Sequence, residues 1–248
     1  SSDLHRRNRD SAFAHMDLFS RQELGLVIYD EVHLLPAQVF RVTASIQARR
    51  RLGLTATLVR EDGREEDVFS LIGPRRYDVP WKVLERQGWI AGARCVEARV
   101  PLPAEQEIRH RAAEGDRARY RLAAENPAKD AVAAALLARH RNDRVLILGQ
   151  YLDQLRRLAR RLGLPLIIGA TPNAERESLY DAVRKGELGA LVVSRVGNFA
   201  VDLAEANVAV QVSGTFGSRQ EEAQRLGRVL RPKEEGGGAL FYTLVTDG

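Results

Sequence analysis

Two adjacent carboxylates follow the first apolar run of the chain. Asp30 and Glu31 stand directly after Leu24–Tyr29 (LGLVIY) and are followed by Val32 and His33. A short apolar run is typical of a buried parallel strand, and open α/β sheets bind ligands at the carboxyl ends of such strands. Aspartate oxygens suit Mg²⁺, held through water, and a neighbouring glutamate could orient or deprotonate an attacking water. The alternative interpretation of the two acids is a plain helix N-cap.

Hydroxyl and guanidinium groups recur later in similar positions. Thr55 and Thr57 follow the next apolar stretch (RLGLTAT), where their hydroxyls could bond across a cleft or simply form a turn. Arg225, Arg228 and Arg231 are spaced three residues apart on an expected helix, so all three point roughly one way. Arginines aimed at a phosphate stabilise the charge that develops during phosphoryl transfer. A solvated basic helix face is the alternative.

The acids, threonines and arginines described above would be brought together by a parallel sheet, which requires strands that alternate with helices. The chain has that pattern. Apolar strand candidates lie at 24–29, 52–55, 145–148, 166–168, 191–193, 208–212 and 240–244. Helix-like stretches lie at 34–49, 64–71, 104–124, 126–140, 151–162 and 174–185. The alternation predicts an α/β architecture with a parallel sheet.

A domain boundary is expected near residues 88–96, where Gly88 and Gly92 punctuate the chain after a loop-like stretch. Residues 96–248 contain enough strands and helices for one complete α/β domain. Residues 1–95 hold only two expected strands with their helices, which is too little to cover a sheet on both faces. We therefore expect a partial domain at 1–95 and a complete domain at 96–248.

The composition indicates the cellular compartment of the chain more clearly than it indicates what the chain binds. The 38 basic and 33 acidic residues give a net charge of +5 that is spread evenly, which permits a nucleic-acid partner without indicating one. Cys95 is the only cysteine, which excludes an intrachain disulfide and indicates a reducing, cytoplasmic setting. We expect Cys95 to be a buried strand residue, and His110 and His140 to be solvated. No run of 18 apolar residues occurs, so no membrane partner is expected.

The order of these motifs resembles that of superfamily 2 helicases. DEVH, TAT and the stretch QRLGRVLR (224–231) stand in the places of motifs II, III and VI. The stretch LTATLVRED, with its Arg-Glu-Asp loop, and residues 194–233 resemble the XPB family, in particular its actinobacterial DNA repair helicases. The resemblance covers nearly the whole chain. It implies an α/β fold with a RecA-like parallel sheet domain (helicase domain 2), preceded by a partial RecA-like helicase domain 1.

The resemblance also implies a role for each matching residue. Asp30 would bind Mg²⁺ through water, Glu31 would position or activate the attacking water, and His33 would link the nucleotide site to the facing domain. Arg228 and Arg231 would reach ATP as arginine fingers. The other implied site residues are Gln224 beside the fingers, Gly197 and Asp202 between nucleotide and DNA, Thr55 and Thr57 in coupling hydrolysis to DNA grip, Arg60, Glu61 and Asp62 in a loop at the duplex fork, and Gly169, Thr171 and Arg176 at the DNA backbone.

Two departures from the family pattern bear on activity. Motif V usually reads Gly-Asp-Thr, whereas this chain has Gly197-Asn198-Phe199. No Gly-x-x-x-x-Gly-Lys-Ser/Thr occurs, so the loop amides and lysine that cradle phosphates are absent. We therefore expect a fragment of a longer ATP-dependent DNA helicase of DNA repair or DNA opening, inactive on its own.

The expected cofactors are ATP and Mg²⁺, and the expected partner is DNA, as a single strand or a fork bound without sequence preference. A partner nuclease is also among the expected partners. Two alternatives stay open. One is the motor subunit of a type III restriction-like system, and the other is a non-catalytic module that docks DNA or protein, which the missing phosphate loop favours.

Overall fold

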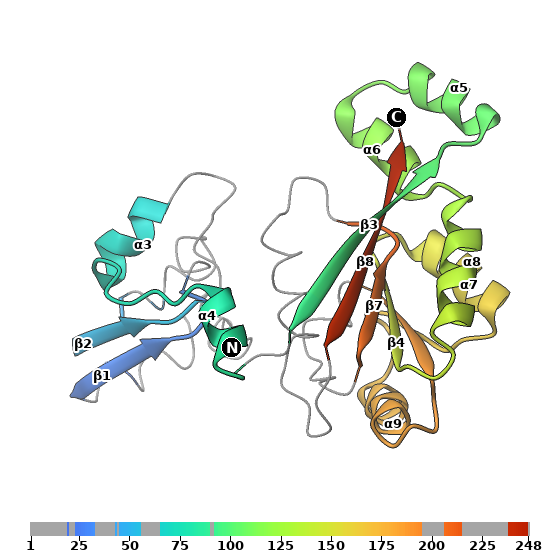
Figure 1. Ribbon diagram of the computed structural model, residues 1–248. Coiled ribbons are helices and arrows are strands. Elements are labelled where there is room, and N and C mark those ends of the chain that lie inside the picture. Colours follow the sequence, from blue (N-terminus) through green and yellow to red (C-terminus); the bar gives the residue numbers. More distant parts are fainter. Residues whose placement is uncertain are drawn as a thin grey trace, which may run out of the picture. The chain divides into compact units, whose positions relative to one another are not determined.

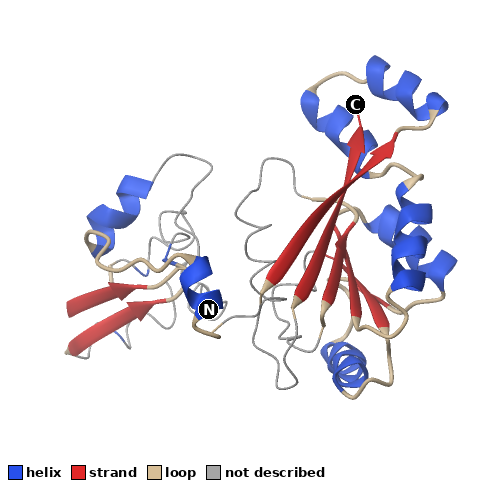
Figure 2. Ribbon diagram, viewed as in Figure 1, coloured by secondary structure: helices blue, strands red, loops and turns tan. Residues whose placement is uncertain are grey.

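The computed structural model describes residues 19, 23–32, 43, 45–55, 65–89, 92–194, 206–214 and 238–247. The chain divides into two compact units, residues 1–78 (unit 1) and 79–248 (unit 2). The expected domain limit at 95/96 stays a prediction. Each unit contains both helices and strands (Figure 2).

Unit 1 contains a pair of parallel strands, β1 (Leu24–Tyr29) and β2 (Ala48–Gly53), and the helix α3 (Glu65–Ile72). β1 and α3 lie where the sequence predicts them. The second strand begins at Ala48, so the predicted helix end at Arg49 and the predicted strand at 52–55 are both wrong in their bounds. The cause is tertiary: Arg51 within β2 donates to the carbonyls of Leu71 (3.0 Å) and Ile46 (3.0 Å), which holds this basic strand against its neighbours.

Unit 2 is built on a six-stranded sheet of order β3-β8-β7-β4-β6-β5, in which every described pair is parallel. Its strands are β3 (Ala93–Pro101), β4 (Val145–Gly149), β5 (Leu166–Ile167), β6 (Ala190–Ser194), β7 (Val208–Gln211) and β8 (Ala239–Asp247). Its helices are α4 (Trp81–Arg86), α5 (Ala104–Ala112), α6 (Asp116–Ala124), α7 (Lys129–Arg139), α8 (Leu152–Leu162) and α9 (Asn173–Arg184). The α/β prediction with a parallel sheet is confirmed.

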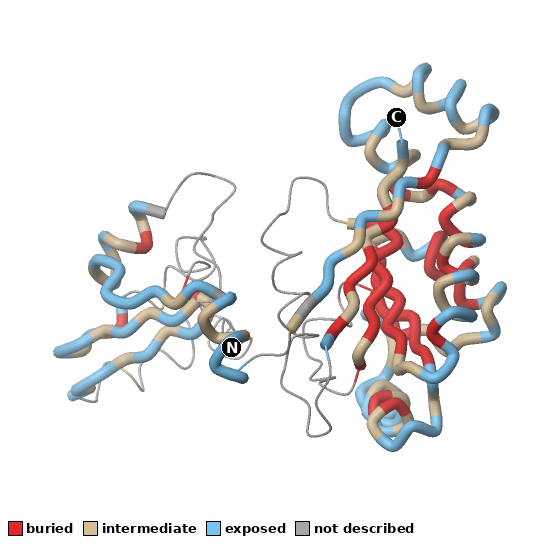
Figure 3. The backbone as a smooth tube through the Cα atoms, in the orientation of Figure 1, coloured by how far each residue is buried: buried red, intermediate tan, exposed pale blue. Residues whose placement is uncertain are grey.

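Helices cover both faces of this sheet (Figure 1). On β4, Val145 and Ile147 pack in one cluster with residues of α7 and α8, whereas Leu146 and Leu148 pack in another with residues of α9. All residues of β4, β6 and β7 are buried, so the centre of the sheet carries the core (Figure 3). Strands buried on both faces read as continuous apolar runs, which is why the sequence locates them well.

Two side chains lie opposite to their predicted burial. Cys95, on the edge strand β3, is exposed rather than buried. His140, which follows α7, is buried rather than solvated, because its ring nitrogens lie 2.8 Å from Asp143 Oδ2 and 3.0 Å from the Tyr242 hydroxyl. His110 on α5 is half-buried. Among the described residues no helix is long and apolar enough to cross a membrane.

Candidate functional site

The two carboxylates form a tight turn directly after β1. Asp30 is exposed, and its Oδ1 accepts a hydrogen bond of 2.9 Å from the Glu31 backbone amide. Glu31 has φ of 51°, in the left-handed region that side chains other than glycine rarely adopt. Such strained backbone clusters at functional sites, where the surrounding structure holds it in place. The turn therefore presents Asp30 at the carboxyl end of the strand, where the sequence predicts a site.

The end of β2 interlocks with this turn. The Leu54 amide donates to the Tyr29 carbonyl (2.8 Å), and the Val32 amide donates to the Leu54 carbonyl (3.0 Å). Val32 is buried and lies so close to Gly53 that a Cβ there would be 2.9 Å from Val32 Cγ2. These contacts place Thr55 at the same edge of the strand pair as Asp30 and Glu31.

A second group of predicted residues lies in the loop before α9 of unit 2. The Thr171 hydroxyl accepts from the Ile168 amide (3.0 Å), and the Arg176 guanidinium donates to the carbonyls of Thr171 (3.2 Å) and Ile168 (3.4 Å). Thr171 and Arg176 therefore shape the backbone of this loop, and Gly169 is exposed within it.

The carboxyl edge of the unit 2 sheet carries a set of polar groups that the sequence did not single out. Gln150 lies just after β4 and Ser213 lies just after β7. The backbone amide of Gln150 donates to Ser213 Oγ (2.9 Å). Gln150 Oε1 and Ser194 Oγ, at the end of β6, are buried without a hydrogen-bond partner in the part of the chain that the structure describes. Their position after three parallel strands was the available signal, because that edge is where such sheets bind ligands.

The remaining predicted site residues lie outside the described residues. They are His33, Thr57, Arg60, Glu61, Asp62, Gly197, Asp202, Gln224, Arg228 and Arg231.

Two solved structures have a fold similar to that of this chain. The ATP-dependent Type ISP restriction-modification enzyme LlaBIII bound to DNA matches with a TM-score of 0.67 at 11% identity, covering 92% of this chain and 18% of that chain. The Hef helicase domain of Pyrococcus furiosus matches with a TM-score of 0.52 at 15% identity, covering 93% of this chain and 74% of that chain. At these identities the likeness shows the fold, which is α/β of the RecA-like helicase type.

Sequence relatives are much more similar. "DNA 3'-5' helicase XPB" of Mycobacterium tuberculosis is 59% identical over 96% of this chain, and that of Kineococcus radiotolerans is also 59% identical over 96%. The yeast "General transcription and DNA repair factor IIH helicase/translocase subunit XPB/SSL2" is 40% identical over 93%. The chain spans 43%, 42% and 28% of the lengths of these three relatives.

The family match covers most of unit 2 and extends over residues 84–248. It includes the loop of Gly169–Arg176, the polar carboxyl edge of the sheet and the arginine-rich stretch 224–231. The chain belongs to the ERCC3/RAD25/XPB C-terminal helicase family.

Proposed function

We propose that these residues are part of an ATP-driven DNA helicase or translocase of the XPB type, acting in DNA repair or DNA opening. One observation carries the proposal: the acidic turn Asp30-Glu31 and Thr55 share the carboxyl edge of one parallel strand pair. The 59% identity to a protein named DNA 3'-5' helicase XPB supports it.

The donor groups fit Mg²⁺ at the acidic turn. Asp30 is exposed at a strand end, and carboxylate oxygens are ligands that Mg²⁺ prefers, often through water. We propose that Asp30 would hold the ion through water, and the ion would supply positive charge beside the phosphates of ATP. The sequence contains no phosphate-cradling Gly-Lys loop, so these residues supply only part of the nucleotide grip.

Hydrolysis then needs a base for water and positive charge for the phosphates. Glu31 would orient the attacking water and accept its proton, since a carboxylate beside the reacting water serves as general base. Arg228 and Arg231 would stabilise the charge that develops on the transferred phosphoryl group, with Gln224 beside them. Gly197 and Asp202 would line the cleft between nucleotide and DNA. His33 would transmit the nucleotide state to the facing domain.

DNA would be held mainly by its backbone. The loop containing Gly169 is braced by Thr171 and Arg176, so its exposed backbone is fixed in shape, as a phosphate contact requires. Thr55 and Thr57 would couple hydrolysis to this grip. The loop of Arg60, Glu61 and Asp62 would engage duplex near a fork. Because such binding exchanges counterions, it should be independent of sequence and weaken steeply with salt.

Cleavage of DNA would fall to another protein. We propose a separate nuclease as a partner in repair, and co-purification of such a nuclease with the full-length protein would test it. The motor subunit of a restriction system is the less favoured candidate, since the family match and the high identities are to XPB proteins.

The test is DNA-stimulated ATPase activity of the full-length protein carrying these residues, with Glu31→Gln as the variant. Removing the base should lower kcat by about 100-fold or more, since general-base groups contribute roughly 10²–10⁴. Glu66→Gln is the matched control, because Glu66 is exposed on α3 of the same unit. Near-normal turnover in Glu31→Gln, or an equal loss in Glu66→Gln, would overturn the proposal.

A further inference from the structure

Cations gather at the amino edge of the unit 2 sheet, the end at which its parallel strands begin. Three helices end beside this edge: α7 before β4, α8 before β5 and α9 before β6. Each of them carries arginine in its last turn, and further cations lie in the turns that lead to the strands. We call the following set the basic edge: Arg139, Arg141, Arg144, Arg160, Arg161 and Lys185.

Contacts across the amino edge connect these helix ends to one another. The Val145 amide, at the start of β4, donates to the Gly189 carbonyl in the turn after α9 (2.9 Å). The Arg144 guanidinium lies beside this turn, since a Cβ at Gly186 would be 3.4 Å from Arg144 Nη2. α7 and α8 pack into one hydrophobic cluster on the other face of the sheet. The basic edge therefore runs from the ends of α7 and α8 across the start of β4 to the end of α9.

Several exposed arginines of unit 2 have acidic partners, but those of the basic edge do not. On the α5–α6 hairpin (residues 104–124), Arg109 pairs with Glu105 (3.3 Å) and Arg111 pairs with Glu107. Among the residues that the structure describes, no cation of the basic edge forms an ion pair. Described acids therefore leave the charge of this edge without direct partners.

The acids near the basic edge offset little of its charge. Asp143 Oδ2 lies 2.8 Å from His140 Nδ1, so this carboxylate is engaged with the buried imidazole. Asp181 pairs with Arg184 in the last turn of α9. Glu187 is exposed in the turn after α9, and the six cations remain in excess over it.

The helix ends explain only part of this positive charge. A cation in the last turn of a helix is favoured by the partial negative charge of the helix end, which fits Arg139, Arg160 and Arg161. Arg141 and Arg144, however, lie in the connection between α7 and β4. Like charges gathered on one surface repel one another, and an anionic partner would relieve that repulsion.

We propose that the basic edge is a docking surface for an acidic segment of a partner protein, rich in glutamate or aspartate. Arginine suits this occupant, because its planar guanidinium can donate to both oxygens of one carboxylate. A single exposed ion pair contributes little to binding. The affinity therefore comes from several cations of the edge that act on one acidic segment together.

DNA is also anionic, but the proposed function places it at the opposite edge of the sheet. The loop of Gly169 follows β5 at the carboxyl edge, and β4, with its five residues, sets the two edges about 17 Å apart. A second grip on DNA phosphates at the amino edge would resist movement along DNA, whereas a bound protein travels with the motor. The choice of a protein over DNA therefore rests on the proposed function.

The experiment measures binding of a fluorescein-labelled polyglutamate peptide to the full-length protein carrying these residues, by fluorescence anisotropy. The variant combines Arg160→Glu with Arg161→Glu. The matched control combines Arg109→Glu with Arg111→Glu, because these arginines also lie in the last turn of a helix and the change in net charge is the same. Peptide affinity should fall about tenfold or more in the variant and change by less than about twofold in the control.

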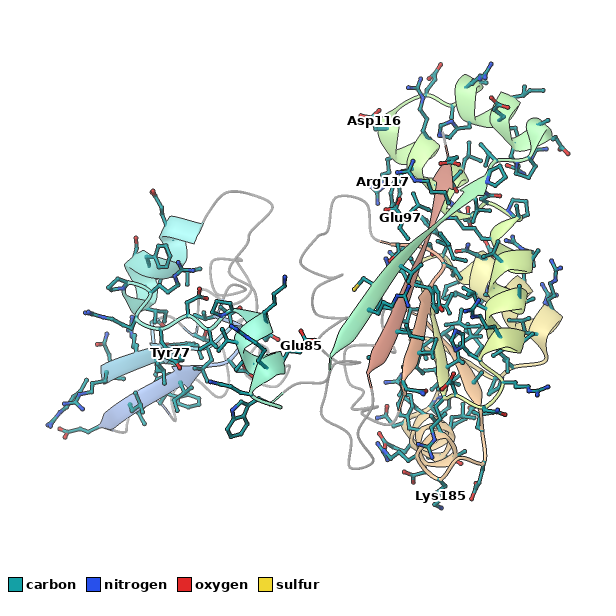
Figure 4. All side chains as sticks on the ribbon, viewed as in Figure 1. Tyr77, Glu85, Glu97, Asp116, Arg117 and Lys185 are labelled. Carbon is teal, nitrogen blue, oxygen red and sulfur yellow. The ribbon has the colours of Figure 1, made fainter. Side chains whose placement is uncertain are left out.

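A second variant, Arg139→Glu with Arg141→Glu, approaches the same surface from α7 and should give a similar loss. It decides the matter if the first variant lowers the thermal midpoint. The control is remote from the basic edge, because Asp116 of the hairpin and Lys185 lie at opposite ends of unit 2 (Figure 4). Binding of single-stranded oligothymidine and DNA-stimulated ATPase activity, measured on the same proteins, should stay within about twofold in both variants.

Three results would overturn the inference. One is the absence of peptide binding by the unsubstituted protein, or an unchanged affinity in both variants. The second is an equal loss in the control, which would assign binding to net charge alone. The third is a loss of oligothymidine binding as large as the loss of peptide binding, which would make the basic edge a nucleic-acid surface. Absence of DNA-stimulated ATPase in the unsubstituted protein would instead refute the proposed function, and the peptide measurements would still decide on the docking surface.

Discussion

Among single residues, Lys129 makes the stability of unit 2 depend on pH in a predictable direction. Burial lowers its pKa to about 8 in the fold, against 10.5 in the unfolded chain, so between these values the unfolded state binds more protons. The free energy of unfolding should therefore rise with pH across this window, by about 3 kcal/mol in total. The penalty is fully present below pH 8, where the buried ammonium stays charged.

Urea unfolding of the parent chain and of Lys129→Met, measured from pH 7 to pH 10.5, isolates this contribution from other titrating groups. The adjacent acid, Asp130, is paired with Arg157, and both proteins share this pair. The variant should be more stable at pH 7, and its advantage should shrink as the pH rises. Parallel curves would show that the lysine is not penalised in the fold.

For single residues, some positions in the structure could be predicted from the sequence and others could not. Asp30, Glu31 and Thr55 could be placed together in advance, because parallel strands bring their carboxyl ends to one edge. The burial of His140 could not, since it depends on Tyr242, 102 residues away. Cysteine is a residue type that is often buried, but Cys95 lies on the edge strand β3 and is exposed. Which strand lies at the edge depends on the order of strands in the sheet, which the sequence around Cys95 does not reveal.

At the scale of elements, the β1–β2 pair depends on the close approach of Gly53 to Val32. A Cβ at Gly53 would lie 2.9 to 3.1 Å from three side-chain atoms of Val32, including its own Cβ, so no rotamer change relieves the contact. Gly53→Ala should destabilise unit 1 by about 1–3 kcal/mol and disturb the acidic turn.

Gly25→Ala is its control on the partner strand, because nothing lies within 4 Å of a Cβ there. Urea unfolding of the two variants makes the comparison. Equal midpoints for both would mean that the turn does not depend on this contact.

A second element-scale feature is the corner between α6 and α7, which is centred on Asn126. This fully buried side chain donates to the Pro101 carbonyl (3.1 Å) and the Thr246 hydroxyl (3.2 Å), and it accepts from the Ala128 amide (3.0 Å). Asn126→Ala should cost about 2–4 kcal/mol, because several buried polar groups lose their partners.

The exposed Asn142 provides the matched control. Asn142→Ala should change the free energy of unfolding by less than about 0.5 kcal/mol. If chemical denaturation gives the two variants the same stability, the corner does not hold the hairpin to the sheet.

The bounds of the strands were predicted well where every residue of the strand is buried. β4, β6 and β7 differ from their predicted bounds by at most one residue at each end, because apolar runs mark strands buried on both faces. β2 failed, because its sequence ARRRLG carries three arginines and its strand conformation depends on pairing with β1 and on the bonds of Arg51. No local pattern contains that information.

For the molecule as a whole, the chemistry expected of an XPB motor is only partly present in these residues. The acidic turn belongs to unit 1, the loop proposed to contact the DNA backbone and the arginine-rich stretch belong to unit 2, and no phosphate-cradling Gly-Lys loop occurs in the sequence of either. The curated relatives are more than twice as long as the part that matches here. ATP turnover should therefore depend on residues beyond these.

The most direct test is ATP hydrolysis, with and without single-stranded DNA, by the full-length protein carrying these residues and by the 248-residue chain alone. We predict DNA-stimulated turnover by the full-length protein and none by the chain alone, since phosphates need the missing cradle. Turnover by the 248-residue chain would mean that its own residues grip the phosphates. That result, or an inactive full-length protein, would contradict the account.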